Sequence, residues 1–228
     1  MAPLRFAKSE AYAQVDAEAE RQILDAYAET LDESNSEDIY LKHLPIIFHK
    51  LNIPHCFTRD IDNCIQWFYD IHFYDSASDS HKSRSVQSLL RQLTLTTTRG
   101  GEQDVSDVVD IDKLILFGNR LVKFRDHFPE IKNAWRLFVE ASKKKSSGNS
   151  NGLRDSDLID SKLTLKDLRS IKGYLELDDI SDSILIDMLG CGTTTLEGQV
   201  LNYEGNSGGL EVGIKDFAEI LGQIGQLD

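Results

Sequence analysis

The chain has few of the cysteines, long apolar runs and excess basic residues that are typical of secreted, membrane-spanning and nucleic-acid-binding proteins. Its 228 residues include only three cysteines, Cys56, Cys64 and Cys191, which provide no disulfide framework. No apolar run approaches the roughly 20 residues of a spanning helix, and the N-terminus lacks the apolar core of a signal peptide. Basic residues number 25 against 38 acidic ones, a net charge of −13. We therefore expect a soluble protein of a reducing compartment that does not bind nucleic acid directly.

Apolar residues recur at helical spacing along most of the chain, whereas strand-like alternation is scarce. The spacing predicts an all-α fold. Asp16 is the expected N-cap of a first helix near 16–30, and Pro129 marks the expected boundary between two lobes. The predicted organisation is a flexible N-terminal arm over 1–15, an N-terminal lobe over 16–128 with a surface insertion at 76–106, and a C-terminal lobe over 129–228 with a flexible loop at 142–160. A short helix at 86–93 is expected within the insertion.

Four of the connecting segments have the spacing of the twelve-residue EF-hand calcium loop but lack its ligands. The β-branched or leucine-type residues at the eighth place are Ile39, Val109, Leu163 and Val212. The residues at the last place, where calcium requires a bidentate glutamate, are His43, Lys113, Asp167 and Asp216. Leu158, at the third place of the third loop, supplies no side-chain oxygen. We therefore expect four degenerate helix-loop-helix hands that do not depend on calcium.

Several sequence motifs resemble known families in order and spacing. Those that resemble centrins are I-K-N-A-W-R-L-F from Ile131, L-T-L-K-D-L-R from Leu163 and I-K-D-F-A-E-I-L from Ile214. A second set of motifs resembles the fungal centrin-like subunit of the nucleotide-excision-repair damage-recognition complex, and this set extends across both lobes. Its members are I-L-D-A-Y-A-E from Ile23, V-V-D-I-D-K-L from Val108 and the ending D-F-A-E-I-L-G-Q-I-G-Q-L from Asp216. The resemblance implies a two-lobed EF-hand-like fold of the centrin or calmodulin type. The chain departs from centrins in its insertions near 76–106, 142–160 and 193–208.

The resemblance also implies a function. The protein that it implies is a nuclear, non-catalytic accessory subunit. This subunit binds a C-terminal helix of the fungal counterpart of the xeroderma pigmentosum group C protein, alongside a ubiquitin-like repair partner. DNA would be contacted by that partner. The chain would be a monomer within the hetero-complex, with no cofactor and no metal.

Centrin-type lobes take up an amphipathic helix in an apolar groove, through anchors at i, i+3, i+4 and i+7. By analogy, the partner-binding candidates of the C-terminal lobe are Trp135, Phe138, Leu168, Ile171, Leu175, Ile184, Leu185, Met188, Phe217, Ile220, Leu221 and Ile224. Most of them must form the lobe core, because apolar stripes at helical spacing usually pack inward. Met188 is the member that favours the surface, since methionine adapts to binding partners. Leu185→Asp and Ile220→Asp are expected to abolish partner binding.

Other interpretations of the sequence are an enzyme, a metal protein, a calcium sensor and a different helix-binding subunit. No nucleophile, base and oxyanion set would converge. His43, His49 and His55 are six residues apart and lack the i, i+4 pairing of a helical metal site. A calcium sensor would give a calcium-dependent heat in calorimetry, which we do not expect. A light-chain-like or centrin-like subunit that clamps a helix of a motor, spindle-pole or export complex would use the same groove, and the sequence does not separate it from a repair subunit.

Overall fold

The computed structural model describes residues 9–74, 86–99, 102–143, 154–177, 179–192 and 210–227. These residues are mostly helical and include one small two-stranded sheet. They divide into two compact units. The N-terminal unit runs from Tyr12 to Asp126, and the C-terminal unit comprises residues 9–11 together with the described residues from His127 onward.

Short and long helices alternate before the sheet. They are α1 (Glu10–Ala13), α2 (Ala17–Ser34), η1 (Leu41–His43), α3 (Leu44–Lys50), η2 (His55–Phe57) and α4 (Arg59–Tyr74). The predicted N-cap of the first long helix is confirmed, because the Asp16 carboxylate accepts hydrogen bonds from the backbone N–H groups of Glu18 and Ala19, each at 3.0 Å. The helix is longer than expected and ends where Asn35 adopts a left-handed conformation with φ 47°.

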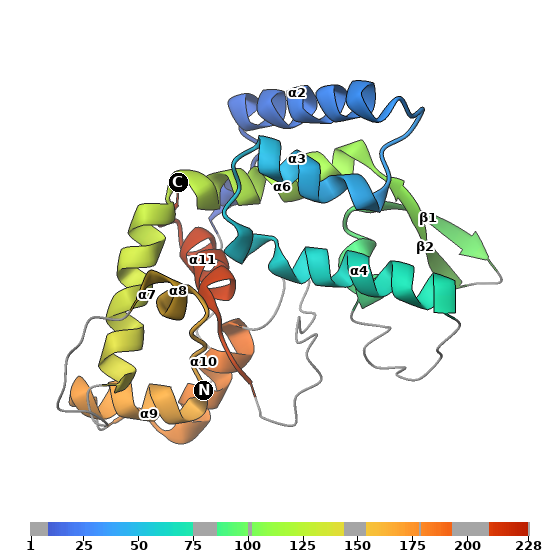
Figure 1. Cartoon of the computed structure of the whole chain (residues 1–228). Coiled ribbons are helices and arrows are strands. Elements are labelled where there is room, and N and C mark those ends of the chain that lie inside the picture. Colours follow the sequence, from blue (N-terminus) through green and yellow to red (C-terminus); the bar gives the residue numbers. More distant parts are fainter. Residues whose placement is uncertain are drawn as a thin grey trace. The chain divides into compact units, whose positions relative to one another are not determined.

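The core of the N-terminal unit lies between α2, α3 and α6 (Ile111–Asp126), and α2 packs on both of the other helices (Figure 1). The ring centroids of the buried Phe57 and Phe124 are 5.2 Å apart. Gly118 permits the close approach of α2 and α6, because a Cβ at this position would lie 2.9 Å from Cδ1 of Ile23. Within the expected N-terminal arm, Tyr12 is buried and stacks on Phe124.

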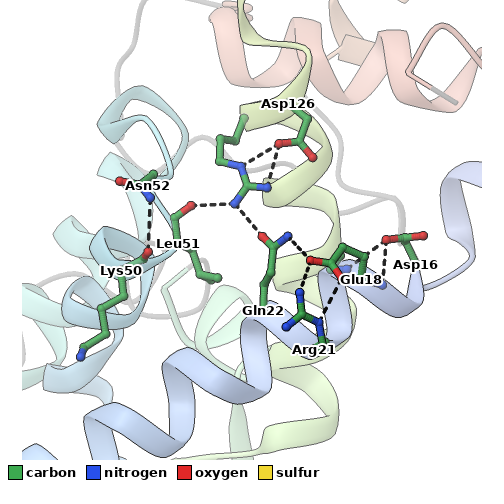
Figure 2. Close-up of polar contacts among 10 residues, drawn as sticks. Asp16, Glu18, Arg21, Gln22, Lys50, Leu51, Asn52 and Asp126 are labelled. Carbon is green, nitrogen blue, oxygen red and sulfur yellow. Dashed lines mark hydrogen bonds and ion pairs between the residues drawn. The ribbon is translucent and has the colours of Figure 1, made fainter.

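A polar network at the C-terminal end of α6 connects three helical segments of the same unit. The Arg125 guanidinium donates to the Leu51 carbonyl at 2.8 Å, to Oε1 of Gln22 at 3.0 Å and to Oδ1 of Asp126 at 2.8 Å. Figure 2 shows these bonds converging from Leu51, Gln22 and Asp126. A cation is favourable at a helix C-terminus. Arg125 therefore joins the end of α6 to α2 and to the end of α3.

The expectation of a mostly helical fold is confirmed. The structure departs from an all-α fold in the antiparallel hairpin of β1 (Thr94–Arg99) and β2 (Glu102–Val109). It lies in the segment that was expected to be a surface insertion, where residues 86–90 are also helical. Leu89, Leu93 and Val105 in this segment are buried. The sequence signal is the threonine-rich run of β1, because β-branched residues favour strands even without clear alternation.

The C-terminal unit consists of α7 (Phe128–Lys143), α8 (Asp155–Ile159), α9 (Leu165–Tyr174), α10 (Asp182–Gly192) and α11 (Ile214–Gln223). Its four longer helices form a closed ring, in which α7 packs on α9, α9 on α10, α10 on α11 and α11 on α7 (Figure 1). The short helix α8 packs against α7 and lies within the range expected to be a flexible loop. Residues 144–153 of that range lie outside the described residues.

Candidate functional site

The residues at the eighth place of the four loops meet in pairs. Leu163 and Val212 exchange both backbone hydrogen bonds, at 2.9 and 3.0 Å, in an isolated antiparallel bridge. In the N-terminal unit a second isolated bridge joins Tyr40 to Val108, and the N–H of Val109 donates to the Ile39 carbonyl at 2.8 Å. Each unit therefore contains two loops that are joined to each other by one short antiparallel link.

The aspartates at the last place of the third and fourth loops are engaged at the starts of helices. Oδ2 of Asp167 accepts from the backbone N–H of Thr164 at 2.9 Å and from its hydroxyl at 2.7 Å. Oδ2 of Asp216 accepts from the backbone N–H of Gly213 at 2.8 Å. Both carboxylates thus satisfy an N–H group at a helix N-terminus, as in a capping box.

A lysine ammonium lies among oxygen atoms at the last place of the second loop. Nζ of Lys113 donates to the carbonyls of Thr94 at 2.7 Å and Arg91 at 3.0 Å, and it lies 3.9 Å from the Asp110 carboxylate. This built-in cation connects α6 to the start of the hairpin. Asp107, earlier in the same loop, accepts from the Tyr69 hydroxyl at 2.5 Å.

We predict that Lys113→Met destabilises the N-terminal unit by about 1–3 kcal/mol, because the two carbonyls lose a charged donor. Lys166→Met, at an exposed position of α9, is the matched control and should change stability by less than about 0.5 kcal/mol. The measurement is amide hydrogen exchange of α6 and the hairpin. Equal protection in Lys113→Met and in the unsubstituted chain would contradict the bridging role of the ammonium.

Other positions that would bind calcium in an EF-hand loop lie within helices in this chain. Asp32 and Ser34 of the first loop lie within α2, and Leu158 of the third is a buried residue of α8. Residues 205–209 of the fourth loop lie outside the described residues. Within the described part of the chain, no group of three or more histidine, cysteine, aspartate or glutamate side chains is arranged to hold a metal ion.

The last residue of the first loop, His43, also caps a helix. Its Nδ1 accepts from the Tyr40 backbone N–H at 3.2 Å, which requires that this nitrogen carries no proton. Burial lowers the pKa of His43, and the nearby Lys42 ammonium lowers this pKa further, against a smaller opposite effect of Asp107. The folded state therefore favours the neutral ring.

We predict that acidification destabilises the N-terminal unit through His43. Because the folded pKa is lowered, the unfolded chain binds the proton more readily, so this stability is present above the unfolded pKa of about 6.5 and is lost as the pH falls through the folded pKa. The loss should be about 0.5–2 kcal/mol, as for a lost helix cap. Amide hydrogen exchange in η1 and α3, measured between about pH 7.5 and 5 and corrected for the intrinsic exchange rate at each pH, reports this loss within the N-terminal unit itself. His43→Gln keeps an acceptor that does not titrate, and an unchanged pH slope in this variant would contradict the assignment.

The twelve predicted partner-binding residues are divided between core and surface. The buried ones are Trp135, Ile171, Leu185 and Phe217. The partly exposed ones are Leu168, Ile220 and Leu221. The exposed ones are Phe138, Leu175, Ile184, Met188 and Ile224. Leu185 is only 3% exposed, so Leu185→Asp would disrupt packing as well as binding and is a poor test of the surface.

Four further exposed apolar residues of the C-terminal unit are not among the twelve candidates. They are Leu137, Tyr174, Leu177 and Ile186. Of the 13 large hydrophobic residues that are exposed in the described part of the chain, nine lie in this unit and four in the N-terminal unit. The sequence of α10 indicates that some of its apolar residues are exposed. Ile184, Ile186 and Met188 are interspersed with Leu185 and Leu189, and no single face of the helix can bury all five.

The nine exposed apolar residues of the C-terminal unit are together called its apolar surface, and one of them, Phe138, is joined to the core through aromatic contacts. The Phe217 ring centroid is 5.4 Å from that of the buried Trp135 and 5.3 Å from that of the exposed Phe138. Nε1 of Trp135 donates to the Leu158 carbonyl at 2.9 Å, which satisfies the indole N–H in the interior. Where exposed apolar side chains gather, other proteins or ligands commonly bind.

Charged residues accompany this surface. Glu176, Asp179 and Asp187 are exposed on the segments that carry the apolar side chains of α9 and α10. Asp182 instead forms an ion pair with Arg169, with 2.8 Å between Nη2 and Oδ2. The surface is therefore apolar with acidic neighbours. No helix among the described residues has the length and hydropathy needed to cross a membrane.

Comparison with known proteins places the chain in a family. The model of the Rad33 family matches residues 9–180, which is more than half of the chain and includes the whole N-terminal unit. Neither the curated proteins nor the solved structures gave a match. The chain therefore belongs to the Rad33 family, which is linked to nucleotide excision repair.

Proposed function

We propose that the chain is a non-catalytic accessory subunit of the nucleotide-excision-repair damage-recognition complex, and that it binds an amphipathic helix of a partner on the apolar surface of its C-terminal unit. The family membership supports the repair role. The observation that carries the binding mode is the concentration of exposed apolar side chains on α7 and α10 and at the C-terminal ends of α9 and α11. A partner helix would bury these side chains through anchors spaced along one of its faces.

The proposed partner is the C-terminal region of the fungal counterpart of the xeroderma pigmentosum group C protein, which would act alongside a ubiquitin-like repair partner. The acidic residues Glu176, Asp179 and Asp187 favour a helix that carries basic side chains beside its apolar ones. Nuclear localisation accompanies a DNA repair function, and the partner rather than this acidic chain would contact DNA.

Binding is proposed to be independent of calcium, on a degenerate EF-hand-like framework. What supports the framework is the pairing of the loops at their eighth places, with the Leu163–Val212 bridge in one unit and the Tyr40–Val108 bridge in the other. What supports independence from calcium is that Asp167 and Asp216 already accept intramolecular hydrogen bonds. The last place of the second loop carries an ammonium group, which would repel the ion.

The test is quantitative co-purification of the tagged full-length chain from nuclear extract, in parallel with calcium and with a chelator. We expect the damage-recognition protein to be enriched equally in both. Enrichment of a motor, spindle-pole or export component in its place would favour the light-chain-like alternative. Enrichment that requires calcium would overturn the ion-independent mechanism.

A further inference from the structure

Ser9, the first residue that the structure describes, lies beside the end of α11 in the C-terminal unit. The backbone N–H of Ser9 donates to the carbonyl of Gln223 at 2.9 Å. Gln223 is the last residue of α11, and the residue that follows it, Ile224, is 44% exposed. Residues 9–11 belong to the C-terminal unit. Ser9 is therefore joined to the end of α11 next to one of the exposed apolar side chains.

The first eight residues have the composition that this surface would bind. They read M-A-P-L-R-F-A-K, with large apolar side chains at Met1, Leu4 and Phe6, basic ones at Arg5 and Lys8, and no acidic residue. The surface itself offers exposed apolar side chains together with exposed carboxylates on α10 and on the connection between α9 and α10. The segment and the surface are thus complementary both in hydropathy and in charge.

The segment is also long enough to reach the surface. Eight extended residues span at most about 26–29 Å, which is close to the ~30 Å diameter of a small domain. From its attachment at the end of α11, the segment can therefore extend to α10 of the same unit.

We propose that residues 1–8 dock on the apolar surface of the same molecule and compete with the partner helix. This inference rests on the proposed function and adds a regulatory element to it. A short tether gives an effective concentration in the millimolar range, so an intrinsically weak contact is sufficient for partial occupancy. The partner then finds only a fraction of the surface vacant, and its apparent affinity falls by that fraction.

The first experiment detects self-docking without any partner. Amide hydrogen exchange is compared between the full-length chain and the double variant Leu4→Ser/Phe6→Ser, which keeps the length and charge of the segment. We expect faster exchange at the end of α9 and in α10 of the variant, because docking stabilises these segments against local opening. The matched control is Ala2→Ser/Ala7→Ser, which should exchange like the unsubstituted chain. Identical exchange in the two double variants would overturn self-docking.

The second experiment separates this inference from the proposed function. The probe is a fluorescein-labelled synthetic helix of leucine and lysine with leucine at i, i+3, i+4 and i+7, and its affinity is measured by fluorescence anisotropy. Leu4→Ser/Phe6→Ser should bind the probe about two- to tenfold more tightly than the unsubstituted chain. If Leu4→Ser/Phe6→Ser and the unsubstituted chain bind the probe with equal affinity, while Met188→Asp still weakens probe binding, self-docking is overturned and the helix-binding surface stands. Affinity that does not respond to Met188→Asp would count against the proposed function, while hydrogen exchange still decides self-docking.

Discussion

Leu175→Asp and Met188→Asp are each expected to weaken binding of the partner helix at least about 30-fold, the effect of losing an interface hot spot of about 2 kcal/mol. The two side chains are 54% and 52% exposed, so the folded chain tolerates the carboxylate. In the complex the same carboxylate would be buried among apolar groups without a partner, which is unfavourable.

The matched control is Leu116→Asp in α6, because Leu116 is 56% exposed and lies in the N-terminal unit. It introduces the same charge at the same degree of exposure and should leave the affinity unchanged. Titration calorimetry with a peptide from the C-terminal region of the damage-recognition protein measures all three variants, after circular dichroism has shown unchanged helix content. Equal losses in all three would indicate a general effect of negative charge and would contradict the assignment of the surface to the C-terminal unit.

This choice of variants shows what the sequence could and could not predict about the site. Helical spacing placed all twelve candidates correctly on helices or at their ends, because the period of the pattern is a local property. Whether a given side chain is buried depends on which helices surround it. Leu185 packs into the core while Met188, one turn later on α10, is exposed. Only the exposed members are suitable for testing binding without disturbing the fold.

The same distinction applies to the fold. The Asp16 cap was predictable because it depends on a residue and the first turn that follows it. The β1–β2 hairpin was missed because its threonine-rich strand shows β-branching without a clear apolar alternation. The helix α8 was missed because its five residues are too few for a periodic pattern. For its one buried residue, Leu158, the loop spacing indicates only that the side chain cannot bind calcium.

The EF-hand loop spacing identified positions that do have a structural role. That role is hydrogen bonding within the protein and not ion binding. At the last places, His43, Asp167 and Asp216 each accept a backbone N–H at a helix start, and Lys113 donates to carbonyls. These bonds are made within each unit and need no ligand. The proposed calcium independence follows from this substitution of internal hydrogen bonds for ion coordination.

Trp135→Ala is expected to destabilise the C-terminal unit by about 3–5 kcal/mol, the usual cost of removing a large aromatic side chain from a core. Trp135 is fully buried on α7, packs on Phe217, and donates its indole N–H to the Leu158 carbonyl. It therefore joins α7 to both α11 and α8. Trp135→Phe retains most of the packing and removes only the indole donor from the Leu158 carbonyl, which still accepts from the Ser161 N–H at 3.3 Å. A smaller loss of about 0.5–1.5 kcal/mol is therefore expected.

Native-state amide exchange of α7 and α9 measures these losses in the C-terminal unit itself, which a global denaturation curve of a chain with two compact units would not resolve. The matched control is Leu137→Ala, two residues further along the same helix, where the side chain is 69% exposed and the change should stay within about 0.5 kcal/mol. If Trp135→Phe lost as much as Trp135→Ala, the hydrogen bond to Leu158 rather than aromatic packing would hold the unit together. If neither variant lost more than Leu137→Ala, the core of the C-terminal unit would not depend on Trp135, and the exposed Phe138 would then need a support other than the Trp135–Phe217 contact.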